Sequence, residues 1–154
     1  MFKTPTSVLV VDDEKALVQM IVESLKEVDF TAYGAYRGED CLKLLQDTHI
    51  DVIILDIKMP GMDGMETLLE VKKRFPLVEV IMLTGHGTIE TSVTGMKQGA
   101  FDYILKPADF DELVEKIGAA RKKKDEHEER IRKAEAQVLL SKSRKGGKKP
   151  FGKQ

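Results

Sequence analysis

The stretch DVIILDIKMPGMDG, residues 51–64, holds the features that decide the fold. Its run Val-Ile-Ile-Leu, residues 52–55, contains no polar residue, and such runs are typical of strands covered on both faces in a parallel sheet. The Pro-Gly and Asp-Gly pairs that follow make the chain turn. Asp56 is therefore predicted at the carboxyl end of a central strand, where open α/β sheets place their sites.

Strand-like and helix-like segments alternate on both sides of this stretch. Short β-rich runs occur at four further places, residues 7–11, 30–36, 78–84 and 101–105, of which 30–36 suits an edge strand. Apolar residues recur at helical spacing between them, in residues 17–25, 38–46, 65–75 and 89–96 and from Asp109 onward. Five strand–helix units predict an α/β fold, a doubly wound parallel sheet with helices on both faces.

Composition and charge indicate one folded domain with a different C-terminal segment. The 154 residues are 42% hydrophobic, which supports one sizeable core. Residues 1–120 contain 12 Lys or Arg and 21 Asp or Glu, whereas residues 121–154 contain 13 and 5. We therefore predict a domain at 1–120 and a charged extension at 121–154. With one cysteine, Cys41, no signal segment and no apolar run that spans a bilayer, we expect a cytoplasmic protein.

The extension is predicted to be helical at first and then disordered. Opposite charges four residues apart, such as Lys122 with Glu126, favour a solvated helix. The Gly- and Lys-rich residues 141–154 are typical of disorder. Ile131 and Val138 have coiled-coil spacing, but polar residues precede them, so a coiled coil is the weaker interpretation. A nucleic-acid-binding regulator that uses this basic segment stays open as an alternative function.

Polar side chains follow the predicted strands at the points where they end. Asp12 and Asp13 follow the first strand, Asp56 the third, Thr84 ends the fourth and Lys106 follows the fifth. The carboxyl ends of parallel strands meet at one edge of the sheet, so these groups are expected to lie together. Each residue alone has an ordinary structural explanation. Three carboxylates within about 4 to 6 Å would repel each other by several kcal/mol, which indicates a bound cation.

The predicted cluster suits Mg²⁺ and a phosphoryl group. Asp12, Asp13 and Asp56 offer hard oxygen ligands without a paired His or Cys, which favours Mg²⁺ over zinc. A carboxylate beside Mg²⁺, with the ammonium of Lys106 and the hydroxyl of Thr84 nearby, can receive a phosphoryl group. The sequence contains no glycine-rich phosphate loop, so a bound nucleotide donor is not indicated.

Four motifs together resemble the receiver domain of bacterial two-component response regulators. They are Asp-Asp at 12–13, DIKMPGMDG at 56–64, TGHG at 84–87 and YILKP at 103–107, and the resemblance runs from Ser7 to Ile117. It implies a flavodoxin-like fold with strand order 2-1-3-4-5. It also implies a single receiver that acts by docking or by relaying phosphate, with no catalytic output beyond its own phosphorylation and dephosphorylation.

The resemblance assigns roles to the strand-end residues. Asp56 would accept a phosphoryl group from a sensor histidine kinase or a histidine phosphotransfer protein. Asp13 would bind Mg²⁺ directly, Asp12 largely through water, and the backbone carbonyl of Lys58 would complete the protein ligands. Lys106 would bridge to the phosphate, and the bond to the following proline is a candidate for the cis form.

The resemblance also implies how the signal leaves the site. Thr84 and Tyr103 match the switch pair of the family: a dianion at Asp56 attracts the threonine hydroxyl, and the tyrosine ring turns inward. The face formed by the fourth helix, the fifth strand and the last helix would then dock a downstream protein or a second copy of the chain. A haloacid-dehalogenase-type phosphatase is a poor alternative, because it needs a second acid where this chain has Lys58.

Overall fold

A five-stranded parallel sheet is the centre of the first of two compact units, Met1–Lys124 and Asp125–Gln154. We call them the sheet unit and the helical extension. The computed structural model describes the backbone of residues 4–153 and the side chains of residues 4–144. The strands lie in the order β2-β1-β3-β4-β5, with bounds β1 Ser7–Val11, β2 Thr31–Ala35, β3 Val52–Leu55, β4 Glu79–Thr84 and β5 Asp102–Leu105. The helices are α1 Lys15–Glu27, α2 Gly38–Asp47, α3 Gly64–Arg74, α4 Ile89–Lys97 and α5 Phe110–Lys153.

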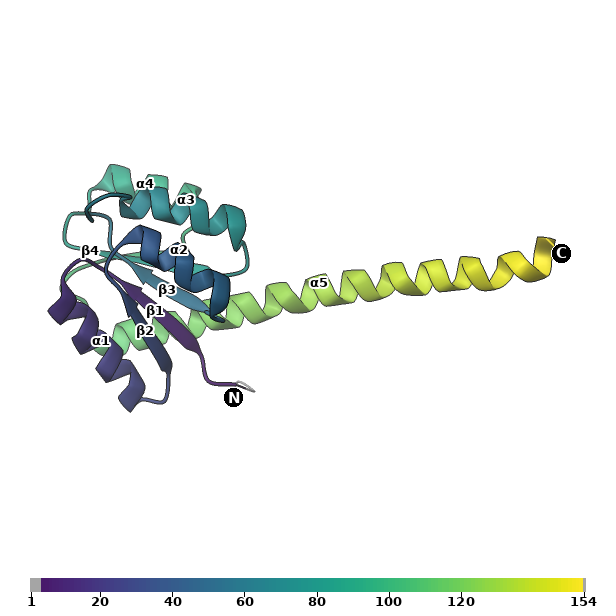
Figure 1. The fold of residues 1–154 in the computed structure, drawn as a ribbon, viewed down its shortest axis with the longest axis horizontal. Helices are drawn as coiled ribbons and strands as arrows, with labels where there is room; N and C mark the ends of the chain where they lie inside the picture. Colours follow the sequence, from purple (N-terminus) through teal and green to yellow (C-terminus); the bar gives the residue numbers. More distant parts are fainter. Residues whose placement is uncertain (1–3, 154) are drawn as a thin grey trace. The chain divides into compact units, whose positions relative to one another are not determined.

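Different helices cover the two faces of the sheet (Figure 1). On one face, Leu25 of α1 and Ile117 of α5 are fully buried in one apolar cluster. On the other face, Cys41 of α2 and Leu68 of α3 are fully buried in a second cluster. The strand order and the helices on both faces confirm the predicted flavodoxin-like fold. Cys41 is a fully buried core residue. Burial raises the pKa of its thiol to about 12, so the thiol stays protonated and is not a nucleophile.

The central strand β3 aligns the carboxyl ends of its two neighbours at one edge of the sheet. All four residues of β3 are buried, as the continuous apolar run predicts, and its neighbours on both sides are β1 and β4. The parallel register places Val11 beside Leu55 and Leu55 beside Met82. The carboxyl ends of these three strands therefore lie side by side. The alternating strand β2 lies at an edge, as predicted.

A buried ionic cluster closes the opposite end of the sheet. Asp51, directly before β3, is only 1% exposed, and it accepts a hydrogen bond from the backbone N–H of Ser7 (2.8 Å). Its carboxylate lies 3.2 Å from the Lys124 ammonium and 3.5 Å from the Arg121 guanidinium. Nε2 of the exposed His49 ring lies 3.0 Å from Asp51 Oδ1, the oxygen that also faces Lys124. Lys124 and Arg121 are themselves buried, so these charges depend on one another.

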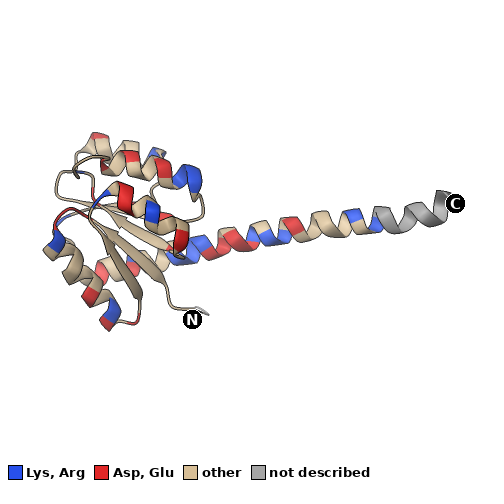
Figure 2. Cartoon of the chain, viewed as in Figure 1, with Lys and Arg blue, Asp and Glu red and all other residues tan. Residues whose placement is uncertain are grey.

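The helical extension consists of the part of α5 beyond Lys124. Lys, Arg, Asp and Glu alternate along its first turns, as predicted for a solvated helix (Figure 2). α5 continues to Lys153, through the residues from 141 onward for which the sequence predicts disorder. The disorder of this segment stays a prediction. Among residues 4–153, no helix is both long and apolar enough to cross a membrane.

Candidate functional site

Three aspartates meet at the carboxyl edge of the sheet. The backbone N–H of Asp56 donates to the carbonyl of Val11 (3.0 Å), and the N–H of Asp12 donates to the carbonyl of Ala35 (3.2 Å). These bonds extend the strand pairing to the aspartates themselves. One carboxylate oxygen from each of Asp12, Asp13 and Asp56 lies within 4.8 Å of the others. Asp12 and Asp56 are buried and Asp13 is exposed, so the cluster is open on one side.

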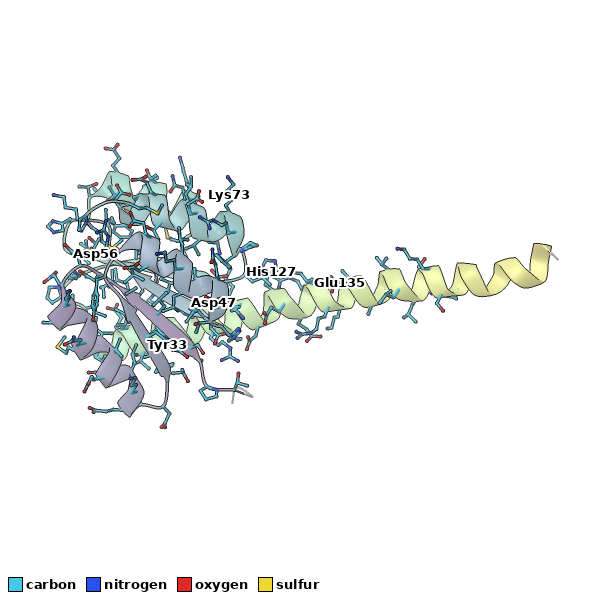
Figure 3. All side chains as sticks on the ribbon, viewed as in Figure 1. Tyr33, Asp47, Asp56, Lys73, His127 and Glu135 are labelled. Atoms are coloured by element: carbon cyan, nitrogen blue, oxygen red, sulfur yellow. The ribbon has the colours of Figure 1, made fainter. Side chains whose placement is uncertain are left out.

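The loop after β3 holds the carboxylate of Asp56 in place. The N–H of Ile57 donates to Asp56 Oδ1 (2.9 Å), and the N–H of Gly64 donates to the carbonyl of Ile57 (2.7 Å). A Cβ atom at Gly64 would overlap the carbonyl oxygen of Asp56, so only glycine allows this close approach. Asp63 then caps α3 by accepting a hydrogen bond from the N–H of Glu66 (2.9 Å). Figure 3 shows Asp56 and Asp47, the last residue of α2, at opposite ends of the sheet unit.

Lys106 brings a positive charge to the three aspartates. Its Nζ lies 2.6 Å from Asp12 Oδ2, 3.2 Å from Glu14 Oε1 and 3.8 Å from Asp56 Oδ2. The peptide bond to Pro107 is cis, as the resemblance indicated. The strand-end argument does not single out Glu14, although it is the third consecutive acid after β1. Its contact with a lysine 92 positions away becomes visible only in the folded chain.

Burial and the neighbouring charges shift the pKa values of Asp56 and Lys106. Burial raises the pKa of Asp56, and the neighbouring charge of Asp12 raises it further. A hydrogen bond from the Thr84 hydroxyl and the charge of Lys106 oppose this shift without reversing it. Burial would lower the pKa of Lys106, but the hydrogen bond and the charge of Asp12 outweigh it, so that pKa is raised. Lys106 thus remains a cation beside a carboxylate whose negative charge is only partly compensated.

Thr84 and Tyr103 have different surroundings. Thr84 is fully buried at the end of β4, and its hydroxyl accepts a hydrogen bond from the N–H of His86 (3.1 Å). Tyr103 is half-buried, its ring packs against the core, and its hydroxyl lies 2.7 Å from Thr91 Oγ1. The sequence argument selected Thr84 and Tyr103 but not Thr91, whose only sequence signal is its place near the start of a helix.

The donor atoms at this edge fit Mg²⁺. All three candidate ligands are carboxylate oxygens, which this small, hard cation prefers, and they lie close enough together to share one ion. Lys58 follows Asp56 by two residues and has an exposed side chain. The role of its backbone carbonyl as a metal ligand stays a prediction.

Comparison with known proteins matches the geometry to one family. The model of the response regulator receiver domain matches residues 8–118, which include every strand-end residue described above. The chain belongs to this family. Receiver domains of response regulators are phosphoacceptor modules of two-component signalling, so this receiver is a signalling protein.

Two relatives share the receiver but are much longer, and one solved structure matches it over nearly its whole length. The chain is 44% identical to an NtrX-like response regulator of Rickettsia felis over 109 residues, 70% of the chain and 23% of the relative. It is 39% identical to the regulatory protein AtoC of Escherichia coli over 106 residues, 69% of the chain and 23% of AtoC. The CheY-like receiver of Methanospirillum hungatei is 28% identical, with a TM-score of 0.77 over 80% of the chain and 99% of that structure. The chain thus spans about a quarter of the two longer relatives.

Proposed function

We propose that Asp56 is the residue of this receiver that is phosphorylated, by the phosphohistidine of a sensor histidine kinase or a histidine phosphotransfer protein. The observation that carries the proposal is the buried carboxylate of Asp56, which lies 3.8 Å from the Lys106 ammonium within the acidic cluster. Asp12, Asp13 and Asp56, with the backbone carbonyl of Lys58, would hold Mg²⁺. The ion would neutralise charge on the transferred phosphoryl oxygens.

The residues of the site divide the work of the transfer. An oxygen of the ionised Asp56 carboxylate attacks phosphorus, and the bond from phosphorus to the donor histidine nitrogen breaks with its electron pair remaining on nitrogen. Lys106 is already close enough to Asp56 to pair with the oxygens that arrive there. The chain itself therefore supplies the nucleophile and a fixed positive charge. We propose no catalytic activity beyond this reaction and the later hydrolysis of its product.

The signal would leave the site through Thr84 and Tyr103. Thr84 ends β4, the strand beside that of Asp56, and Tyr103 lies two strands from the acceptor on β5. Large apolar side chains are exposed on the adjoining surface of α4 and β5: Ile89, Val93, Met96 and Leu105. A phosphorylation-dependent change in Tyr103 would alter this surface, where a downstream protein or a second copy of the receiver would dock.

Replacing Asp13 by alanine is expected to abolish phosphorylation without unfolding the sheet unit. Asp13 is exposed, so the change leaves no cavity, and it removes one of three clustered negative charges. Mg²⁺ titrations followed by amide chemical shifts should show at least tenfold weaker binding, because a direct ligand is lost. The matched control is Asp47→Ala, which removes the same charge at the opposite end of the sheet. A loss of thermal stability in Asp13→Ala would make Asp13 a structural residue and contradict its role as a ligand.

Replacing Glu14 by glutamine is expected to speed phosphorylation modestly. Glu14 holds Lys106 at 3.2 Å and competes with the incoming phosphoryl oxygens for its charge. Because Glu14 is largely exposed, the rate of labelling by a small acyl phosphate should rise only about twofold to fivefold. Glu23→Gln, an identical charge change at an exposed position within α1, should leave the rate unchanged. Slower labelling of Glu14→Gln would instead show that Glu14 orients Lys106 for the transfer.

A further inference from the structure

The side chain of Tyr103 lies in a slot formed by three residues spaced four apart: Gly87, Thr91 and Gly95. Residues four apart lie on the same side of a helix, so Thr91 and Gly95 present one face of α4 to the tyrosine. A Cβ at Gly95 would lie 3.7 Å from Cδ2 of the ring, and a Cβ at Gly87 would lie 2.6 Å from the hydroxyl oxygen. Gly95 therefore lies beside the ring, Thr91 binds the hydroxyl, and Gly87 leaves room for that hydroxyl.

The hydroxyl of Thr91 joins Tyr103 to the start of α4. The Thr91 hydroxyl carries one proton and two lone pairs. It donates to the carbonyl of Thr88 (3.0 Å) and accepts from the N–H of Thr88 (2.9 Å), which is half of the capping box that begins α4. The Thr88 hydroxyl lies 3.2 Å from the same oxygen, and the Tyr103 hydroxyl lies 2.7 Å from it, where either partner can donate. The tyrosine thus completes the polar contacts of the residue that starts the helix.

The slot is connected to the phosphoacceptor through a short loop. Thr84 ends β4, the strand beside that of Asp56, and its hydroxyl accepts a hydrogen bond from the N–H of His86. Gly87 follows immediately, and Thr88 is the N-cap of α4. Tyr103 also lines a groove of about 490 Å³ together with Gly87, Thr88, Ile89, Ser92 and Leu105. Its position therefore determines one wall of this groove.

We propose that Thr91 is a positioning residue that latches Tyr103 in its inward position and so couples the start of α4 to the switch. This inference rests on the proposed function, because it assigns the control of the same Thr84–Tyr103 pair to a third residue. If Tyr103 turns outward, Thr91 loses one hydrogen bond and the slot beside Gly95 loses its ring. The latch therefore favours the inward position and shapes the groove on the docking surface.

Nuclear Overhauser contacts between the Tyr103 ring and Gly95 measure the inward population in the full chain. Thr91→Val is expected to lower the ratio of inward to outward Tyr103 about threefold to tenfold, the usual effect of one lost hydrogen bond. Thr91→Ser keeps the hydroxyl and should keep the ratio. Tyr103→Phe removes the tyrosine hydroxyl and leaves the capping box intact, so the ratio of inward to outward ring should fall by the same factor. In the Thr91→Val background, Tyr103→Phe should add no further decrease, because the bond is already absent.

Two glycine variants test the slot while both hydroxyl groups stay in the chain. Gly87→Ala should displace the Tyr103 hydroxyl and weaken the contacts with Gly95, because its Cβ would lie 2.6 Å from that oxygen. Gly95→Ala, whose Cβ would meet the ring at an ordinary distance of 3.7 Å, should preserve the inward ring. Unchanged ring contacts in Thr91→Val, Tyr103→Phe and Gly87→Ala would overturn the latch. Labelling of Asp56 by a phosphodonor is measured in the same samples, and its absence from the unaltered chain would instead overturn the proposed function.

Discussion

Covalent labelling of the chain by a small acyl phosphate with Mg²⁺ is expected to fall to background when Asp56 is replaced by asparagine. An amide lacks the charged oxygen that attacks phosphorus, while its size and much of its hydrogen bonding are preserved. Intact mass spectrometry would show one added phosphoryl group on the unaltered chain and none on Asp56→Asn. The control is Asp47→Asn, an equal charge change at the far end of the sheet, which should label normally.

The same variant should be more stable than the unaltered chain when Mg²⁺ is absent. The pKa of Asp56 is raised in the folded protein, chiefly by burial, so its ionised form is less favourable there than in the unfolded chain. That destabilisation is present in full above the folded pKa and disappears as the pH falls through it. Asp56→Asn removes it, and thermal unfolding at neutral pH should show a higher midpoint. Undiminished labelling of this variant would mean that another acid is the acceptor.

Replacing Asp51 by asparagine is expected to destabilise the sheet unit by about 3 to 5 kcal/mol, because two buried cations lose the carboxylate that pairs with both. Arg121 and Lys124 are 6% and 4% exposed, and the Asp51 carboxylate lies within 3.5 Å of both. Urea unfolding measures the loss as a lower midpoint at an unchanged slope. The control is Glu70→Gln, which breaks a partly exposed pair with Arg74 and should change stability by less than about 1 kcal/mol.

The cluster around Asp51 also makes the stability of the unaltered chain fall at low pH. Burial alone would raise the pKa of Asp51, but the N–H of Ser7 and the charges of Lys124 and Arg121 outweigh it, so the pKa is lowered. The contribution of Asp51 is therefore complete above its unfolded value near 3.8 and is lost as the pH falls through the lower folded value. The stability difference between the unaltered chain and Asp51→Asn should shrink below about pH 4. A difference under 1 kcal/mol at neutral pH would show that the buried charges are indifferent to this carboxylate.

The sequence was sufficient for the α/β class and for placing the site residues at one edge of the sheet, because both follow from local patterns. The strand order 2-1-3-4-5 came from the resemblance to receiver domains. A continuous apolar run predicts a central strand, and parallel strands bring their carboxyl ends to one edge. The structure accordingly places the carboxylates of Asp12, Asp13 and Asp56 within 4.8 Å of one another and Lys106 beside them. No long-range contact had to be known in advance for this inference.

Contacts between distant segments could not be predicted in the same way. The composition boundary after Ala120 assigns Arg121 and Lys124 to a charged extension, yet both are buried against Asp51, which lies 70 and 73 positions earlier. A basic residue looks the same in a sequence whether it is solvated or paired in a core. The Thr91–Tyr103 bond escaped prediction for a similar reason, since neither hydroxyl carries a pattern that names its partner.

The charged residues at one end of the sheet form the candidate site, whereas those at the other end form a buried ionic cluster, so mutations at the two ends should have different effects in a cell. Aspartates that face solvent or a cation gather at one end, whereas the buried pairs of Asp51 lie at the other. In a library of single substitutions scored for cellular abundance and for signal output, the two ends should give different phenotypes. Variants of Asp13 and Asp56 should accumulate normally and fail to signal. Variants of Asp51, Arg121 and Lys124 should be degraded, and the few molecules that survive should still respond.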